Sequence, residues 1–198
     1  MIPRAGRAFP LTISTTLPDA AVTIATAFNR EGIAGVLTGE AASAIHTRDR
    51  THCRTLTYHL TPPVSSSRLV SALRHLGFAT QGAPMPHIDA GFDLALTEAP
   101  LVIGRNDTIV AQTMQLRNGF VRVLSPTDCC REWLLQWRAT QTDREMEHAI
   151  GVATCCEVNL PAMRVWMRKE QITTAWPAFK KLVDRGRAQP AARVSRPL

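Results

Sequence analysis

The amino-acid sequence predicts an α+β fold, in which a mixed β-sheet is flanked by helices and followed by a C-terminal helical annex. The first observation is the segment 33–60, which has the pattern of an apolar strand, a glycine turn, a short helix and a second, alternating strand. The second is Asn118-Gly119 between two apolar segments, a strong signal for a two-residue hairpin. The third is the helical spacing of apolar residues after Pro126. The chain is therefore expected to form a sheet first and helices afterwards.

Length and composition limit the class of protein. With 198 residues and 45% hydrophobic residues, the chain can bury one good core. No apolar segment approaches the roughly 20 residues of a membrane span, and no secretory signal is evident, so we expect a cytoplasmic protein with no membrane partner. The five cysteines are odd in number and their spacings suggest no disulfide framework, which fits a reducing compartment. A net charge of +7 would suit an acidic partner such as nucleic acid.

Composition along the chain predicts four segments. The N-terminal residues lack periodicity, and the last residues are mostly Arg, Ala, Pro and Ser without an apolar face. The expected order is an N-terminal leader at 1–16, an α/β domain at 17–124, a helical subdomain at 125–186 and a disordered basic tail at 187–198.

The first helix is expected to begin near Pro18, which suits a first turn, and to end before Gly32. A strand at 33–37 follows, then a small-residue helix at about 40–45. The next strand carries three alternating apolar residues that share a face: Leu56, Tyr58 and Leu60. Serines at 65–67 offer N-caps for a helix that Gly77 closes.

Short strands and a hairpin are expected in the middle of the chain. Apolar segments at 78–80, 92–96 and 101–103 predict short strands. The segments 109–116 and 120–124 should pair as the Asn118-Gly119 hairpin.

Helices are expected from Ser125 onwards. Ser125 is an N-cap followed by Pro126, which is typical of a helix start. A second helix should begin at about 144, a third after Asn159, and a fourth after Thr174. Three tryptophans are expected in the helical core: Trp133, Trp137 and Trp166.

Two sets of residues resemble the polymerase-β-like nucleotidyltransferases, including the minimal ones of bacterial toxin–antitoxin systems. The resemblance covers about 32–170. In the first half it rests on Gly39, Ala42, Ile45, His46, Arg50 and Thr51, and in the second on Pro100, Leu101, Gly104, 125–129, Asp143 and Arg144. The chain departs from the family pattern at three positions, where Glu40 replaces a turn glycine, Trp133 an arginine and Glu145 a glutamine.

The resemblance implies an Asp-x-Asp strand that binds Mg²⁺, and this strand lacks its acids. A two-metal phosphoryl-transfer site needs two or three converging carboxylates. The sequence contains no Asp or Glu from 50 to 88. Depending on the alignment, the acidic pair falls on Cys53 and Thr55 or on Arg54 and Leu56. A third carboxylate could come from Asp89, Asp93 or Glu98, but one acid cannot build the site. The catalytic motif is therefore degenerate, and no cofactor is expected.

Several other residues could have a functional role, but an ordinary structural role is favoured for each of them. Gly39 and Glu40 could belong to a phosphate-binding turn, although Glu40 opposes anion binding and an ordinary turn glycine is favoured. The histidines His46, His52 and His59 could be metal ligands or a general base, but no spaced partner supports this, so solvated or half-buried side chains are favoured. The cysteine pairs at 129–130 and 155–156 are interpreted as small core residues. We expect no metal site.

Basic side chains could form a surface for nucleic acid or an acidic protein, and a merely solubilising face is an equal alternative. The candidates are Arg48, Arg50, Arg54, Lys180 and Lys181.

Three functions remain open. The first is a degenerate nucleotidyltransferase-fold protein that binds a partner protein or nucleic acid, in a toxin–antitoxin or defence-type system. The second is an active nucleotidyltransferase with a rearranged Mg²⁺ site that modifies RNA or protein. The third is a basic nucleic-acid-binding module. The missing acids favour the first over the second.

Overall fold

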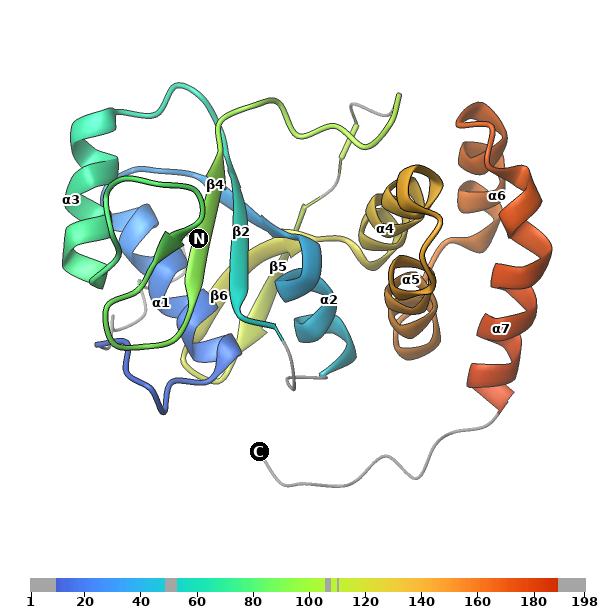
Figure 1. The fold of residues 1–198 in the computed structure, drawn as a ribbon, viewed down its shortest axis with the longest axis horizontal. Helices are drawn as coiled ribbons and strands as arrows, with labels where there is room; N and C mark the ends of the chain where they lie inside the picture. The colour runs from blue at the N-terminus through green and yellow to red at the C-terminus, as the bar shows by residue number, and fades with distance from the viewer. Residues whose placement is uncertain (1–9, 49–52, 106–107, 110, 189–198) are drawn as a thin grey trace.

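The computed structural model confirms the predicted α+β fold (Figure 1). It describes residues 10–48, 53–105, 108–109 and 111–188. The described strands form one six-stranded mixed sheet in the order β3-β4-β2-β1-β6-β5. The strands are β1 Gly35–Thr38, β2 Thr55–Leu60, β3 Met85–Pro86, β4 Asp93–Thr97, β5 Ala111–Leu116 and β6 Gly119–Leu124. The helices are α1 Leu17–Arg30, α2 Gly39–Thr47, α3 Ser66–Leu76, α4 Pro126–Thr140, α5 Asp143–Cys155, α6 Leu160–Lys169 and α7 Trp176–Ala188.

Strand pairing follows the predicted unit at 33–60. β1 is antiparallel to β2 and parallel to β6, and β2 is parallel to β4. β5 and β6 form the predicted hairpin, in which Leu116 pairs with Gly119 across a two-residue turn. The carboxyl end of β1 therefore leads into α2 at the centre of the sheet.

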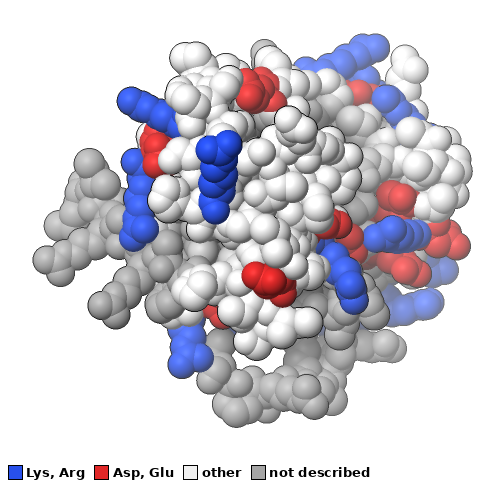
Figure 2. Space-filling view, turned by 60° about the vertical axis from the view of Figure 1, so that its left-hand side comes forward, with Lys and Arg blue, Asp and Glu red and all other residues white. Residues whose placement is uncertain are grey.

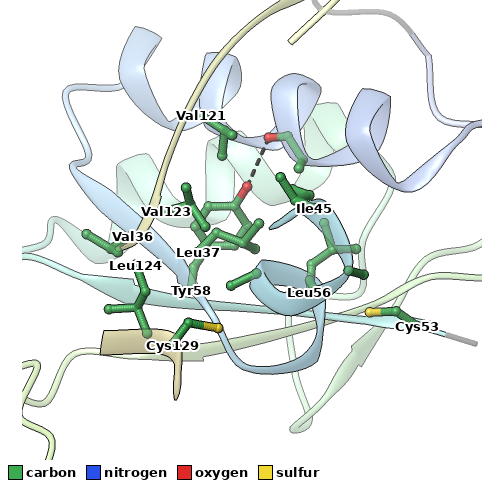
Figure 3. Packing of buried hydrophobic residues seen from close by; sticks show 14 of the residues in the cluster. Val36, Leu37, Ile45, Cys53, Leu56, Tyr58, Val121, Val123, Leu124 and Cys129 are labelled. Atoms are coloured by element: carbon green, nitrogen blue, oxygen red, sulfur yellow. Dashed lines mark hydrogen bonds between the residues drawn. The ribbon is translucent and has the colours of Figure 1, made fainter. Parts of the chain in front are cut away.

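The core begins on the side of the sheet that faces α1 and continues through α2 into the helices α4 to α7. Leu56, Tyr58 and Leu60 are buried, as the alternation predicts. The Tyr58 hydroxyl donates a hydrogen bond of 2.9 Å to the carbonyl of Ala21 (dashed line in Figure 3). The Tyr58 ring packs edge-on against Phe28, with ring centroids 5.6 Å apart. This contact fixes α1 on β2.

We expect Tyr58→Phe to lower the free energy of unfolding by about 1 kcal/mol, because it removes one buried hydrogen bond and keeps the ring. Urea unfolding measures the change. Tyr58→Leu, which also removes the edge-on contact, should cost more. Equal stability of wild type and Tyr58→Phe would show that the hydroxyl contributes nothing.

α2 lies between the sheet and the helices α4 and α5 (Figure 1). Ser43 of α2 accepts a hydrogen bond from the Trp133 indole of α4 at 2.5 Å. Cys129, also on α4, lies 3.2 Å from the same hydroxyl. The helices that follow the sheet therefore pack directly on the central unit.

Helix starts agree closely with the sequence pattern. The Ser125 hydroxyl accepts from the amide of Asp128 at 3.1 Å, and the Asn159 side chain accepts from Ala162 at 3.0 Å. α5 begins one residue earlier than expected, because Thr142 is the N-cap. Trp133 and Trp166 are buried, whereas Trp137 is half-buried.

Several boundaries differ from the prediction. The segment 78–80 makes only an isolated bridge between Phe78 and His87, and 101–103 forms no strand with the described residues. Leu11 is buried, so the leader is docked at this residue. α7 extends to Ala188, because the Arg187 guanidinium donates to the carbonyl of Ala153 at 2.7 Å. The tail was predicted to begin at 187, and 189–198 lie outside the described residues.

Candidate functional site

One face of the sheet carries polar residues at its centre. In β2, Thr55 and Thr57 alternate with the buried core residues and therefore point to the opposite face. Strand register places Thr38 beside Thr57 and Asp93 beside Thr55. We call these four residues the polar face; it spans β1, β2 and β4.

The two residue pairs that could correspond to the acids of the family lie in different surroundings in the structure. Leu56 is fully buried in the core, so the pair Arg54 and Leu56 does not face the polar side. Cys53 is buried just before β2, and burial, with the nearby charge of Glu40, raises the pKa of its thiol to about 12. Thr55 and Thr57 are the pair with the correct spacing on the polar face. Sequence reasoning missed Thr57, although the alternation of 55–60 was the signal that could have found it.

The donors on the polar face do not fit a two-metal site. Asp93 is its only carboxylate, and the two threonines offer neutral hydroxyls, whereas paired Mg²⁺ ions need several carboxylates. Asp89 and Glu98 are exposed and lie outside the β strands. Among the described residues, no cluster of three or more His, Cys, Asp or Glu side chains could hold a metal ion.

The N-terminus of α2 is closed by a carboxylate from α4. Gly39 adopts a positive φ of 64°, and its amide donates a hydrogen bond of 2.9 Å to Oε2 of Glu132. Thr38, the N-cap residue, makes no side-chain cap, so Glu132 serves this role. A carboxylate is favoured there by the helix dipole. Burial nevertheless raises the pKa of Glu132 to about 7, while the Gly39 hydrogen bond opposes the shift.

Glu132 was not predicted as a site residue, because it lies 93 residues from Gly39 in the chain. Glu40 was a candidate for the same turn, and it instead forms an ion pair with Arg144 of α5 at 3.1 Å. This pair is partly exposed and contributes little to stability. Its position ties the first turn of α2 to the helical subdomain.

His46 is less exposed than expected, whereas His59 is half-buried, as predicted. His46 is buried, and its Nε2 lies 2.8 Å from the carbonyl of Leu124. Burial lowers the pKa of His46 and of the half-buried His59. His52 lies outside the described residues. Cys129 and Cys130 are fully buried, as expected for core residues.

The predicted basic residues do not gather on one surface among the described residues. Arg48 and Arg54 are exposed near the sheet, and α5 lies between α2 and α7, which carries Lys180 and Lys181 (Figure 1). Lys180 pairs with Asp184 at 2.6 Å. Figure 2 shows a face on which acidic and basic side chains are interspersed over a broad neutral surface. Arg50 lies outside the described residues.

A groove of about 540 Å³ lies between α6 and α7. Its floor and rim combine apolar and basic side chains, and Val165 is 54% exposed. We call it the α6–α7 groove; its main residues are Leu160, Arg164, Val165, Arg168, Trp176 and Lys180.

The order of strands, the glycine turn at Gly39 and the flanking helices define a nucleotidyltransferase-like fold. The chain is similar to the crystal structure of an antigenic nucleotidyltransferase-like protein from Paracoccidioides brasiliensis, with a TM-score of 0.61 and 12% sequence identity. The similarity covers 89% of this chain and 95% of that chain, and at this identity it establishes the fold alone. No family model and no curated protein sequence matches the chain. None of the described helices has the length and hydropathy that crossing a membrane requires.

Proposed function

We propose that this chain is a catalytically degenerate nucleotidyltransferase-fold protein that acts by binding a partner. The observation that carries the proposal is the hydrogen bond between Glu132 and the Gly39 amide. Amides at a helix N-terminus attract the phosphates of a nucleotide. Here the carboxyl group of Glu132 occupies the first such amide, so a triphosphate in the same place would have to displace it and, above about pH 7, would also meet its negative charge.

The second support is the lack of a metal anchor. Phosphoryl transfer depends on Mg²⁺ ions that neutralise the triphosphate. The two positions of β2 that have the Asp-x-Asp spacing on the polar face are threonines, Thr55 and Thr57, and Asp93 is the only carboxylate of that face. An active enzyme would need further carboxylates to reach this face, and the described strands around it supply none.

The partner is proposed to be a protein with an acidic, partly apolar segment. The α6–α7 groove offers Leu160, Val165 and Trp176 for apolar contacts, with Arg164 and Arg168 at its edge. Apolar floors with charged rims are typical of protein interfaces. By resemblance, we place this role in a toxin–antitoxin or defence-type system. Nucleic acid is less favoured, because the predicted basic residues are spread over separate elements.

We expect the wild-type protein to show no Mg²⁺-dependent nucleotide binding and no nucleotide transfer. Isothermal titration with each nucleoside triphosphate and Mg²⁺ measures the first, and labelling of the protein and of bulk tRNA measures the second. The double variant Thr55→Asp with Thr57→Asp should gain Mg²⁺ affinity, because three carboxylates then share one face.

The matched control is Thr113→Asp with Gln115→Asp, which places two acids at the same spacing on the exposed strand β5. It should gain no comparable affinity. Metal-dependent labelling by the wild type that Asp93→Ala abolishes would overturn the proposal and establish an active enzyme. Asp89→Ala serves there as the control for a surface acid.

A further inference from the structure

A second pocket lies away from the polar face, between α4, α6 and the segment that follows Ile103. Its volume is about 340 Å³. Three cationic side chains line it, together with one carboxylate and an apolar wall. The residues that matter are Arg105, Arg131, Val165, Trp166, Lys169 and Glu170.

The carboxylate of Glu170 is already engaged and does not neutralise the pocket. Glu170 is buried, and its Oε1 accepts a hydrogen bond of 2.7 Å from the amide of Arg105. Its Oε2 lies 3.7 Å from Arg138, which is outside the pocket. Arg131 is paired with Asp128 at 2.8 Å, and Glu170 is paired with Arg138, so Arg105 and Lys169 leave the lining positive.

The position of Arg105 is held by close packing. Gly104 has a positive φ of 63°, and a Cβ on it would come within 2.5 Å of the Glu170 side chain. Only glycine permits this approach without displacement of the carboxylate. The backbone of Gly104 and Arg105 is therefore held against Glu170 at the end of α6.

Two donors at the pocket lack acceptors. The Arg131 guanidinium donates from Nη1 to Asp128 at 2.8 Å, but its buried Nε has no acceptor. Arg131 also lies over the Trp166 ring, at 5.9 Å from the centroid. Trp166 is only 5% exposed, and its indole N–H has no acceptor either. Buried donors without acceptors are costly, so a small shift of either side chain that brings its donor to an acceptor oxygen of a ligand would relieve that cost.

We propose that this pocket binds a phosphate monoester that carries a ring or another flat apolar group. A phosphate dianion supplies acceptors for Arg105, Arg131 and Lys169, and arginine binds phosphate with two parallel hydrogen bonds. The apolar group packs against Val165 and Trp166. None of the lining residues belongs to the polar face, so the site stands whether or not nucleotide transfer is lost.

Calorimetric titration of the full chain tests the site with phenyl phosphate as the probe. Three compounds serve as comparison ligands. Inorganic phosphate lacks the ring, phenol lacks the charge, and benzoate has a ring but carries a planar monoanion in place of the phosphate. We expect phenyl phosphate to bind about tenfold or more tightly than each of these three, and salt to weaken it. Arg105→Gln and Lys169→Gln should each weaken it about tenfold, because each removes a charged hydrogen bond.

Lys181→Gln is the matched control, since Lys181 is an exposed cation on α7 outside the pocket. Its affinity should equal that of the wild type. NMR provides a second readout: the indole N–H resonance of Trp166, assigned by its loss in Trp166→Phe, should move on addition of phenyl phosphate. No saturable binding, equal affinity for benzoate, an equal loss in Lys181→Gln or an unmoved Trp166 resonance would each overturn the proposal.

Discussion

Replacement of Trp133 by alanine should lower the free energy of unfolding by about 3–5 kcal/mol, as is typical when a buried aromatic side chain is truncated. Trp133 is 6% exposed and stacks on His148 of α5 with ring centroids 4.2 Å apart. Its indole also donates to Ser43 of α2. One side chain thus joins α4 to both α2 and α5, and its loss leaves a cavity where these helices meet.

Chemical denaturation monitored by circular dichroism measures the change. Trp137→Ala is the control, because Trp137 lies one turn further along the same helix and is only half-buried. It should cost clearly less. Equal and small losses in both variants would show that the α2, α4 and α5 junction does not depend on Trp133. Trp133→Phe keeps an aromatic ring but removes the indole N–H. A large loss of unfolding free energy in this variant would assign part of the effect to the hydrogen bond with Ser43.

Local rules predicted the elements whose causes lie within a few residues. The hairpin follows from Asn118-Gly119, and the starts of α4 and α6 follow from Ser125 and Asn159, whose side chains cap nearby amides. The buried face of β2 follows from strict alternation. These features need no knowledge of distant parts of the chain.

The candidate site depends on contacts that no local rule contains. Glu132 reaches Gly39 only because α4 packs beside α2, and Asp93 reaches Thr55 only through the register of β2 and β4. The end of α7 was misplaced for the same reason: the sequence near Arg187 has no apolar face, but the guanidinium binds carbonyls at the end of α5. The buried state of His46 likewise follows from its contact with Leu124 in β6.

The Glu132 carboxylate should make the protein less stable as the pH rises from about 4.5 to about 7. Burial raises the pKa of this group in the folded protein to about 7, whereas in the unfolded chain it returns to about 4.5. Between these values the folded state holds the proton and the unfolded state does not, so folding is favoured at the lower pH. Above both values the buried charge is present in full, and at about 1.4 kcal/mol per pKa unit this difference of roughly 2.5 units costs about 3 kcal/mol.

Glu132→Gln isolates this effect, because the amide oxygen can still accept from Gly39 while the charge is absent. We expect the variant to match the wild type near pH 4 and to exceed its free energy of unfolding by about 3 kcal/mol near pH 8. Urea titrations at a series of pH values measure the difference. Burial lowers the pKa of His46 and of His148, so these groups make the free energy of unfolding rise with pH. Because both histidines are present in the wild type and in Glu132→Gln, their effect cancels in the difference between the two proteins.

Glu132→Ala, which also leaves the Gly39 amide without an acceptor, should be less stable than Glu132→Gln at every pH. A pH-independent difference between wild type and Glu132→Gln would mean that the carboxylate is solvated, and that the first amide of α2 is open to an outside anion.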